Sequence, residues 1–118
     1  MTNRDDERRK LRATYEQAPR RAGVYLLRNT VTGRILVGSS PDLRSVRNRL
    51  DFGQQTESTG VLDRRMVVDA RAHGMASFEL EILDELKVVD GWTDAELAAD
   101  LRELEALWRT QLADRAHY

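Results

Sequence analysis

Three short segments of the chain have the hydrophobic patterning of β-strands. Residues 23–28 and 34–38 are mainly apolar, and the turn at residues 30–33 separates them and ends in Gly33. Such a short connection predicts an antiparallel hairpin. Residues 78–83 alternate apolar with acidic side chains, which is the two-residue period of a strand with one buried face. We expect this third strand to join the hairpin in a small sheet.

Three segments in the first two thirds of the chain have the composition of helices. Residues 3–17 contain neither Gly nor Pro and predict an N-terminal helix. A helix of about a dozen residues opens near Pro41, because the missing N–H of proline costs nothing in the first turn. A polar loop is expected at residues 53–60. The next helix, over 61–72, ends before Gly74, which we expect to be a left-handed cap.

The longest predicted helix begins at Thr93 and continues to about Ala113. Thr93 and Glu96 have the spacing of a capping box. The apolar residues of this helix fall on one face, so it should pack on the sheet; they are Leu97, Leu101, Leu104 and Trp108. The order α-β-β-α-α-β-α predicts an α/β protein of the α+β type, with a small three-stranded antiparallel sheet flanked by helices. At 118 residues the chain has room for one domain.

Composition excludes several classes of protein. Hydrophobic residues make up 41% of the chain, too many for a disordered protein. No cysteine is present, which excludes disulfides, thiolate metal sites and a cysteine nucleophile. No apolar run approaches the ~20 residues of a membrane helix. The first residues are charged where a secretory signal is apolar, so we expect a cytoplasmic protein without membrane contact.

Charge is distributed unevenly along the chain although the net charge is only −1. Residues 1–50 carry 12 basic and 5 acidic side chains, and residues 51–118 carry 7 basic and 15 acidic ones. A basic first part suits a phosphate-binding surface, since Lys and Arg supply the sequence-independent part of nucleic-acid affinity. Attraction between the two parts within the fold is the alternative explanation.

Several short motifs are spaced along this order of elements. The first two predicted strands carry Gly23-Val24-Tyr25 and Leu36-Val37-Gly38, and Ser39-Ser40 follows the second. Further along come Asn48-Arg49, the pair His73-Gly74 before the third strand, and the segment from Leu101 to Trp108, which contains Glu105. The ordered set resembles the GIY-YIG nuclease superfamily over about residues 22–112. It looks most like small stand-alone bacterial proteins of that superfamily.

The resemblance implies a GIY-YIG-like domain over residues 22–113, between an N-terminal helical extension (1–21) and a tail (114–118). It also implies an endonuclease that hydrolyses DNA phosphodiester bonds with one divalent metal, Mg²⁺ or Mn²⁺. The catalytic residues that it implies are Tyr25 near the attacking water, Arg47 or Arg49 at the phosphate, and Glu105 as the metal ligand. The residues expected to contact nucleic acid are Ser39, Ser40, Arg44, Arg47, Asn48 and Arg49. Negative charge develops on the phosphate in the transition state of this reaction, and a bound cation and hydrogen-bond donors stabilise it.

The sequence departs from the superfamily pattern at three positions. Leu36 stands where the second motif has a Tyr, Val46 stands near the position of the catalytic Arg, and Leu50 stands where many relatives have a His. An aliphatic side chain neither donates nor accepts a hydrogen bond. A catalytically inactive nucleic-acid-binding module on the same fold is therefore an alternative function. A protein-interaction domain that uses the acidic late strand and helix is a second alternative, and no obligate protein partner is inferred.

The candidate residues also have purely structural interpretations. Tyr25 fits a half-buried strand aromatic, and Glu105 fits an i,i+4 ion pair with Arg109. The arginines fit a solvated helix surface, and Ser39 and Ser40 fit caps of the next helix. The nuclease interpretation makes a geometric prediction that separates it from these: Tyr25, Glu105 and Arg47 or Arg49 should line one groove. Leu36 should then lie on the floor of that groove.

Overall fold

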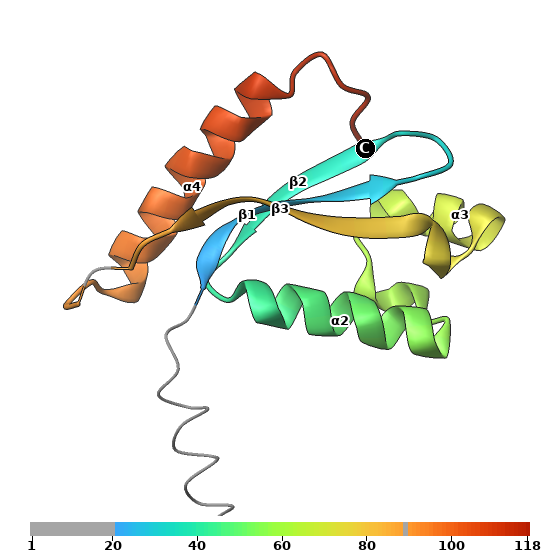
Figure 1. Cartoon of the computed structure of the whole chain (residues 1–118), viewed down its shortest axis with the longest axis horizontal. Helices are drawn as coiled ribbons and strands as arrows, with labels where there is room; N and C mark the ends of the chain where they lie inside the picture. The colour runs from blue at the N-terminus through green and yellow to red at the C-terminus, as the bar shows by residue number, and fades with distance from the viewer. Residues whose placement is uncertain (1–20, 89) are drawn as a thin grey trace, which may run out of the picture.

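The computed structural model describes residues 21–88 and 90–118, so the helix predicted over residues 3–17 lies outside the described part. Strands and helices follow one another in the expected order (Figure 1). In the described ranges no helix combines the length and apolar composition needed to cross a membrane. The elements are β1 (Ala22–Asn29), β2 (Ile35–Ser40), α2 (Leu43–Thr56), η1 (Thr59–Val61), α3 (Arg64–His73), η2 (Met75–Ser77), β3 (Phe78–Leu86) and α4 (Asp94–Gln111).

The three strands form one antiparallel sheet in the order β2-β1-β3, which confirms the predicted topology. β1 is the central strand, and β2 and β3 are the edges. In the register of β1 and β2, Tyr25 lies opposite Gly38 and Leu27 lies opposite Leu36. The register of β1 and β3 shifts between Val24 and Tyr25. This pairing places the motifs Gly23-Val24-Tyr25 and Leu36-Val37-Gly38 on neighbouring strands of the sheet.

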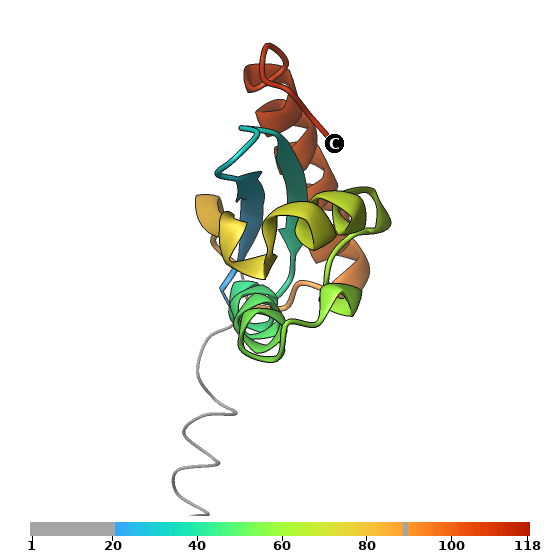
Figure 2. The same ribbon diagram turned by 90° about the vertical axis from the view of Figure 1, so that its right-hand side faces the viewer.

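Helices cover both faces of the sheet, with α4 on one side and α2 and α3 on the other (Figures 1 and 2). Because successive strand residues point to opposite faces, the α4 side receives Val24 and Leu26 from β1, while the other side receives Tyr25 and Leu27. On the α4 side these residues pack against Trp108 and its neighbours. Tyr25 and Leu26 therefore point to opposite faces of the sheet.

The helix after β2 is longer than expected and begins differently. The predicted loop over residues 53–60 starts too early, because α2 continues to Thr56 and ends at Glu57, which has a φ of 52°. Gly53 is buried inside α2, where a Cβ would lie 2.4 Å from the side chain of Val61. Gly53 thus permits close packing instead of breaking the helix. The N-cap is Asp42, whose carboxylate accepts a hydrogen bond from the amide of Arg44, so neither Ser39 nor Ser40 caps the helix.

The boundaries of the later elements follow from local capping. α3 begins at Arg64 instead of residue 61, because Asp63 accepts the hydrogen bond of an N-cap from the amide of Arg65. Gly74 ends α3 with a positive φ of 87°, but its ψ of 155° lies outside the left-handed helical region. Thr93 accepts a hydrogen bond from the amide of Glu96 at 3.1 Å, which confirms the predicted start of α4.

The C-terminal tail returns to the sheet at the start of β2. The amide of Ile35 donates to the carbonyl of Ala116 at 2.9 Å, and the amide of Tyr118 donates to the carbonyl of Ile35 at 3.0 Å. The hydroxyl of Tyr118 accepts from the side chain of Asn29 at 2.9 Å and donates to Asp69 at 2.8 Å. The tail therefore connects β1, β2 and α3 through hydrogen bonds.

Candidate active site

A cleft of about 340 Å³ opens between the sheet, α2 and the segment around η1. Its floor is apolar and includes Leu36 and Leu50, and its polar lining residues are Tyr25, Arg49 and Asp63. Leu36 belongs to β2, Arg49 to α2, and Asp63 to the N-cap of α3. Tyr25 belongs to β1, so the side chains that line the cleft come from four separate stretches of the chain.

Tyr25 reaches across β2 because its cross-strand partner has no side chain. A Cβ on Gly38 would lie 2.7 Å from the hydroxyl oxygen of Tyr25, so any larger residue would push the ring away. Within residues 21–88 and 90–118 the hydroxyl of Tyr25 has no hydrogen-bond partner. This hydroxyl is therefore directed over the edge strand and forms no hydrogen bond with the described residues.

Three charged side chains act on the Tyr25 phenol. Burial raises its pKa above the usual 10.0, the negative charge of Glu105 raises it further, the positive charge of Arg49 lowers it, and Asp63 raises it. Electrostatic effects of this kind require the charges to lie near the phenol. Tyr25 and Arg49 line one cleft, as the nuclease interpretation predicts, but Glu105 is not among the residues that line it. Tyr25 keeps its proton at neutral pH, because its pKa is raised.

Glu105 comes from α4, which packs on the sheet face opposite to Tyr25. Its side chain is 21% exposed and forms an ion pair of 3.0 Å with Arg109. Arg109 in turn donates a hydrogen bond of 3.1 Å to the carbonyl of Val37, the residue before Gly38 on β2. Since β2 is an edge strand, α4 can bring Glu105 to the same edge over which the Tyr25 ring lies.

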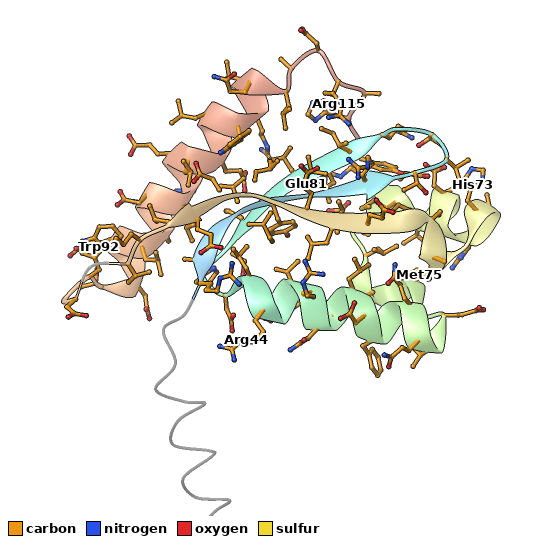
Figure 3. The ribbon with its side chains drawn as sticks, in the orientation of Figure 1. Arg44, His73, Met75, Glu81, Trp92 and Arg115 are labelled. Carbon is orange, nitrogen blue, oxygen red and sulfur yellow. The ribbon has the colours of Figure 1, made fainter. Side chains whose placement is uncertain are left out.

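Of the two candidate arginines, the structure brings only Arg49 to the cleft. Residues two apart on a helix are rotated by about 200°, so Arg47 points to the opposite flank of α2. Arg44 lies about 60° from Arg47 by the same geometry. Figure 3 shows Arg44 at the start of α2, below the helix in that view. The three predicted phosphate-binding arginines of α2 therefore lie on two flanks of the helix, with Arg49 on one and Arg44 and Arg47 on the other.

The remaining predicted nucleic-acid contacts do not line the cleft. The hydroxyl of Ser40 accepts from the amide of Asp42 and donates to its carbonyl, both at 3.0 Å, so it stabilises the turn into α2. Ser39 is half-buried in β2, and Asn48 is exposed on α2. None of these three side chains is among the residues that surround Tyr25 and Arg49.

Two polar residues of this region were not among the sequence-based candidates. Asp63 was missed because the predicted helix began before it, although an Asp at a helix start is an ordinary N-cap signal. Its carboxylate also binds the Arg65 side chain at 2.9 Å, and these hydrogen bonds lower its pKa to about 2. Arg109 was considered only as a structural partner of Glu105. Its bond to Val37 depends on how α4 packs and has no sequence signal.

The carboxylates of this region fit only a sparse type of metal site. In the described parts of the chain, no group of three or more His, Cys, Asp or Glu residues could hold a metal ion. Mg²⁺ in phosphoryl-transfer sites is often held by one or two carboxylates together with substrate phosphates and water. A single carboxylate such as Glu105, which is partly buried and does not line the cleft, is compatible with that mode alone. The described residues do not provide a metal site built entirely by the protein.

Comparison of the fold with solved structures finds two similar structures of one catalytic domain. The catalytic domain of the intron endonuclease I-TevI, in a mutant form, is 20% identical, with 79% of this chain and 84% of that chain covered and a TM-score of 0.57. Another structure of the catalytic domain of the homing endonuclease I-TevI is 22% identical, with 78% and 88% covered and a TM-score of 0.54. Neither a protein-family model nor a curated protein sequence matches the chain. The chain has a GIY-YIG-like fold, which confirms at the level of the fold the resemblance seen in its motifs.

Proposed function

We propose that this protein is an endonuclease that hydrolyses phosphodiester bonds in DNA with one divalent cation, Mg²⁺ or Mn²⁺. The observation that carries the proposal is the cleft that Tyr25 and Arg49 line together, with the Tyr25 hydroxyl over Gly38. The charges of Glu105 and Arg49, which shift the pKa of Tyr25 in opposite directions, support it. Tyr25, Glu105 and Arg49 come from β1, α4 and α2, so the proposed site depends on the tertiary fold. The similarity to endonuclease catalytic domains supports the same type of chemistry.

Each residue has a distinct role in this proposal. Arg49 binds the scissile phosphate, because a guanidinium donates two parallel hydrogen bonds to phosphate oxygens. The Tyr25 hydroxyl, which lacks a partner among the described residues, orients the attacking water or a phosphate oxygen. Glu105 holds the divalent cation, which when bound supplies positive charge to stabilise the transition state. Leu36 provides no second hydroxyl, so we expect slow turnover.

A catalytically inactive DNA-binding module is the second candidate function. The apolar floor of the cleft, with Leu36 and Leu50 at positions where the superfamily has polar groups, specifically favours it. Neither side chain can hold a water molecule or a phosphate oxygen by a hydrogen bond. The two candidates differ in one observable property, which is metal-dependent strand cleavage.

The decisive assay incubates pure protein with single-stranded, duplex and branched DNA in the presence of Mg²⁺, Mn²⁺ or EDTA. An endonuclease cleaves at least one of these substrates with either metal and none in EDTA. Glu105→Gln removes the proposed ligand charge and should abolish cleavage. Cleavage that persists in this variant indicates a contaminating nuclease or a different site, and binding without cleavage by the wild-type protein supports the inactive module.

A matched pair of arginine variants tests how DNA enters the cleft. Arg49→Ala should weaken binding and reduce cleavage, whereas Arg47→Ala removes the same charge from the other flank of α2. Both variants should lower the salt dependence of affinity, because each phosphate contact releases counterions. Only Arg49→Ala should also slow cleavage at saturating DNA. Equal effects on cleavage would contradict the placement of Arg49 at the phosphate.

A further inference from the structure

One guanidinium connects the candidate metal ligand to the edge of the sheet. The same Nη2 atom of Arg109 lies 3.0 Å from the Oε2 atom of Glu105 and donates to the carbonyl of Val37 at 3.1 Å. The Glu105 side chain is 21% exposed, whereas that of Arg109 is 55% exposed. The carboxylate is thus held in a partly buried place while much of its partner faces solvent.

This pairing neutralises the charge that a divalent cation needs. A half-buried carboxylate requires a counter-charge, because removal from water disfavours the ionised form. In the described part of the chain, Arg109 is the ion-pair partner of Glu105. A cation that binds Glu105 must therefore compete with Arg109 for the carboxylate, and the positive charge of Arg109 repels it.

We propose that Arg109 is an internal counter-ion for Glu105, which divalent-cation binding must displace. The inference rests on the proposed function to the extent that Glu105 is the metal ligand. In the free protein, Arg109 weakens the binding of a cation to Glu105. Glu105 and Arg109 then alternate between an ion pair with each other and separate contacts with a cation and with solvent.

The geometry makes displacement feasible. Arg109 is more than half exposed, so its guanidinium can move into water without crossing a packed region. A divalent ion competes for the carboxylate with twice the charge of the guanidinium.

Manganese binding measures the effect without any dependence on cleavage. Free Mn²⁺ is followed by electron paramagnetic resonance during titration of the wild type, Arg109→Gln, Arg109→Lys and Glu105→Gln. Glutamine removes the charge but keeps a donor for the carbonyl of Val37, and lysine keeps the charge. We expect Mn²⁺ to bind Arg109→Gln at least about tenfold more tightly than the wild type, since the ion no longer meets a neighbouring positive charge. Arg109→Lys should stay close to the wild type.

A double variant and a cleavage assay assign each failure to one of the two proposals. Adding Glu105→Gln to Arg109→Gln should remove the tighter binding; tighter Mn²⁺ binding that survives overturns the inference, because the ion then binds elsewhere. Equal, weaker or undetectable binding in Arg109→Gln also overturns it, and weaker binding would identify Arg109 as a residue that positions Glu105. Thermal melts exclude unfolding as the cause. Tighter binding to a variant that cleaves no DNA upholds the inference while the proposed endonuclease function fails.

Discussion

Tyr25 and Tyr118 pack against the same apolar cluster beneath the sheet, but their hydroxyl groups have opposite surroundings. The hydroxyl of Tyr118 both accepts and donates a hydrogen bond, and the Arg34 guanidinium lies 4.3 Å from the centre of its ring. The hydroxyl of Tyr25 has no such partner among the described residues, although charged side chains act on it. One tyrosine completes a hydrogen-bond network, and the other faces a cleft.

The difference separates a structural site from a candidate functional one. Buried polar groups that serve the fold are normally satisfied by the protein itself. Asn29 is fully buried, and its amide group bonds to Tyr118 and to the backbone of the β1–β2 turn. Around Tyr25, by contrast, charges gather without saturating the hydroxyl, as in sites that complete their contacts with a ligand.

The largest expected effect is on the structural side of this comparison. Asn29→Ala should lower the free energy of unfolding by about 3 kcal/mol, because it leaves the turn amides of Val31 and Thr32 without their acceptor and removes one hydrogen bond from the hydroxyl of Tyr118. Urea denaturation measures the change, with the exposed Asn48→Ala as the matched control. A loss below about 1 kcal/mol would show that the network is not a main source of stability.

A smaller effect is expected at Asp63, which both caps α3 and borders the cleft. Asp63→Ala should cost about 1 kcal/mol through loss of the cap, whereas Asp63→Asn should retain most of it. The pKa of Asp63 is lowered to about 2, so its ionic contribution is complete above the ordinary value of 3.8 and is lost as pH falls through 2. The stabilities of wild type and Asp63→Asn should therefore differ by a constant amount above pH 4 and converge as the pH falls from 4 to 2. Parallel curves would contradict the shifted pKa.

The smallest expected effect is spectroscopic and concerns Tyr25 itself. Its pKa is raised by burial and by Glu105, so the phenol should ionise above pH 10, and any stability from this shift is lost as pH rises beyond that value. Glu105→Gln should lower the pKa of Tyr25, and Arg49→Ala should raise it. Ultraviolet difference titration measures both shifts, with Tyr25→Phe to assign the signal. Shifts in the reverse directions would mean that these charges do not face the phenol.

The sequence was sufficient to predict the elements whose signals are local. The hairpin followed from its turn, β3 from the alternation that begins at Phe78, and the start of α4 from Thr93 and Glu96. The length of α2 was underestimated because Gly53 was interpreted as a loop residue. Its role depends on contact with Val61, which no local pattern encodes.

The arrangement of the candidate site depended on tertiary structure. Sequence spacing left Arg47 and Arg49 equivalent, and the rotation of α2 against the sheet distinguishes them. The position of the Tyr25 ring over β2 depends on the absence of a side chain at Gly38, and the effect of the Glu105 charge on Tyr25 depends on how α4 packs. Asp63 could not be placed until the start of α3 was known.

Parallel measurement of cleavage and stability in Tyr25→Phe and Tyr118→Phe tests the central claim most directly. Each variant removes one hydroxyl from a tyrosine of the same apolar cluster. Tyr25→Phe should reduce metal-dependent DNA cleavage by about 100-fold or more and leave the free energy of unfolding nearly unchanged. Tyr118→Phe should lower that free energy by about 1 kcal/mol and leave cleavage intact. Cleavage that is unchanged in Tyr25→Phe, or that the wild-type protein does not perform, would contradict the assignment of the cleft as a nuclease active site.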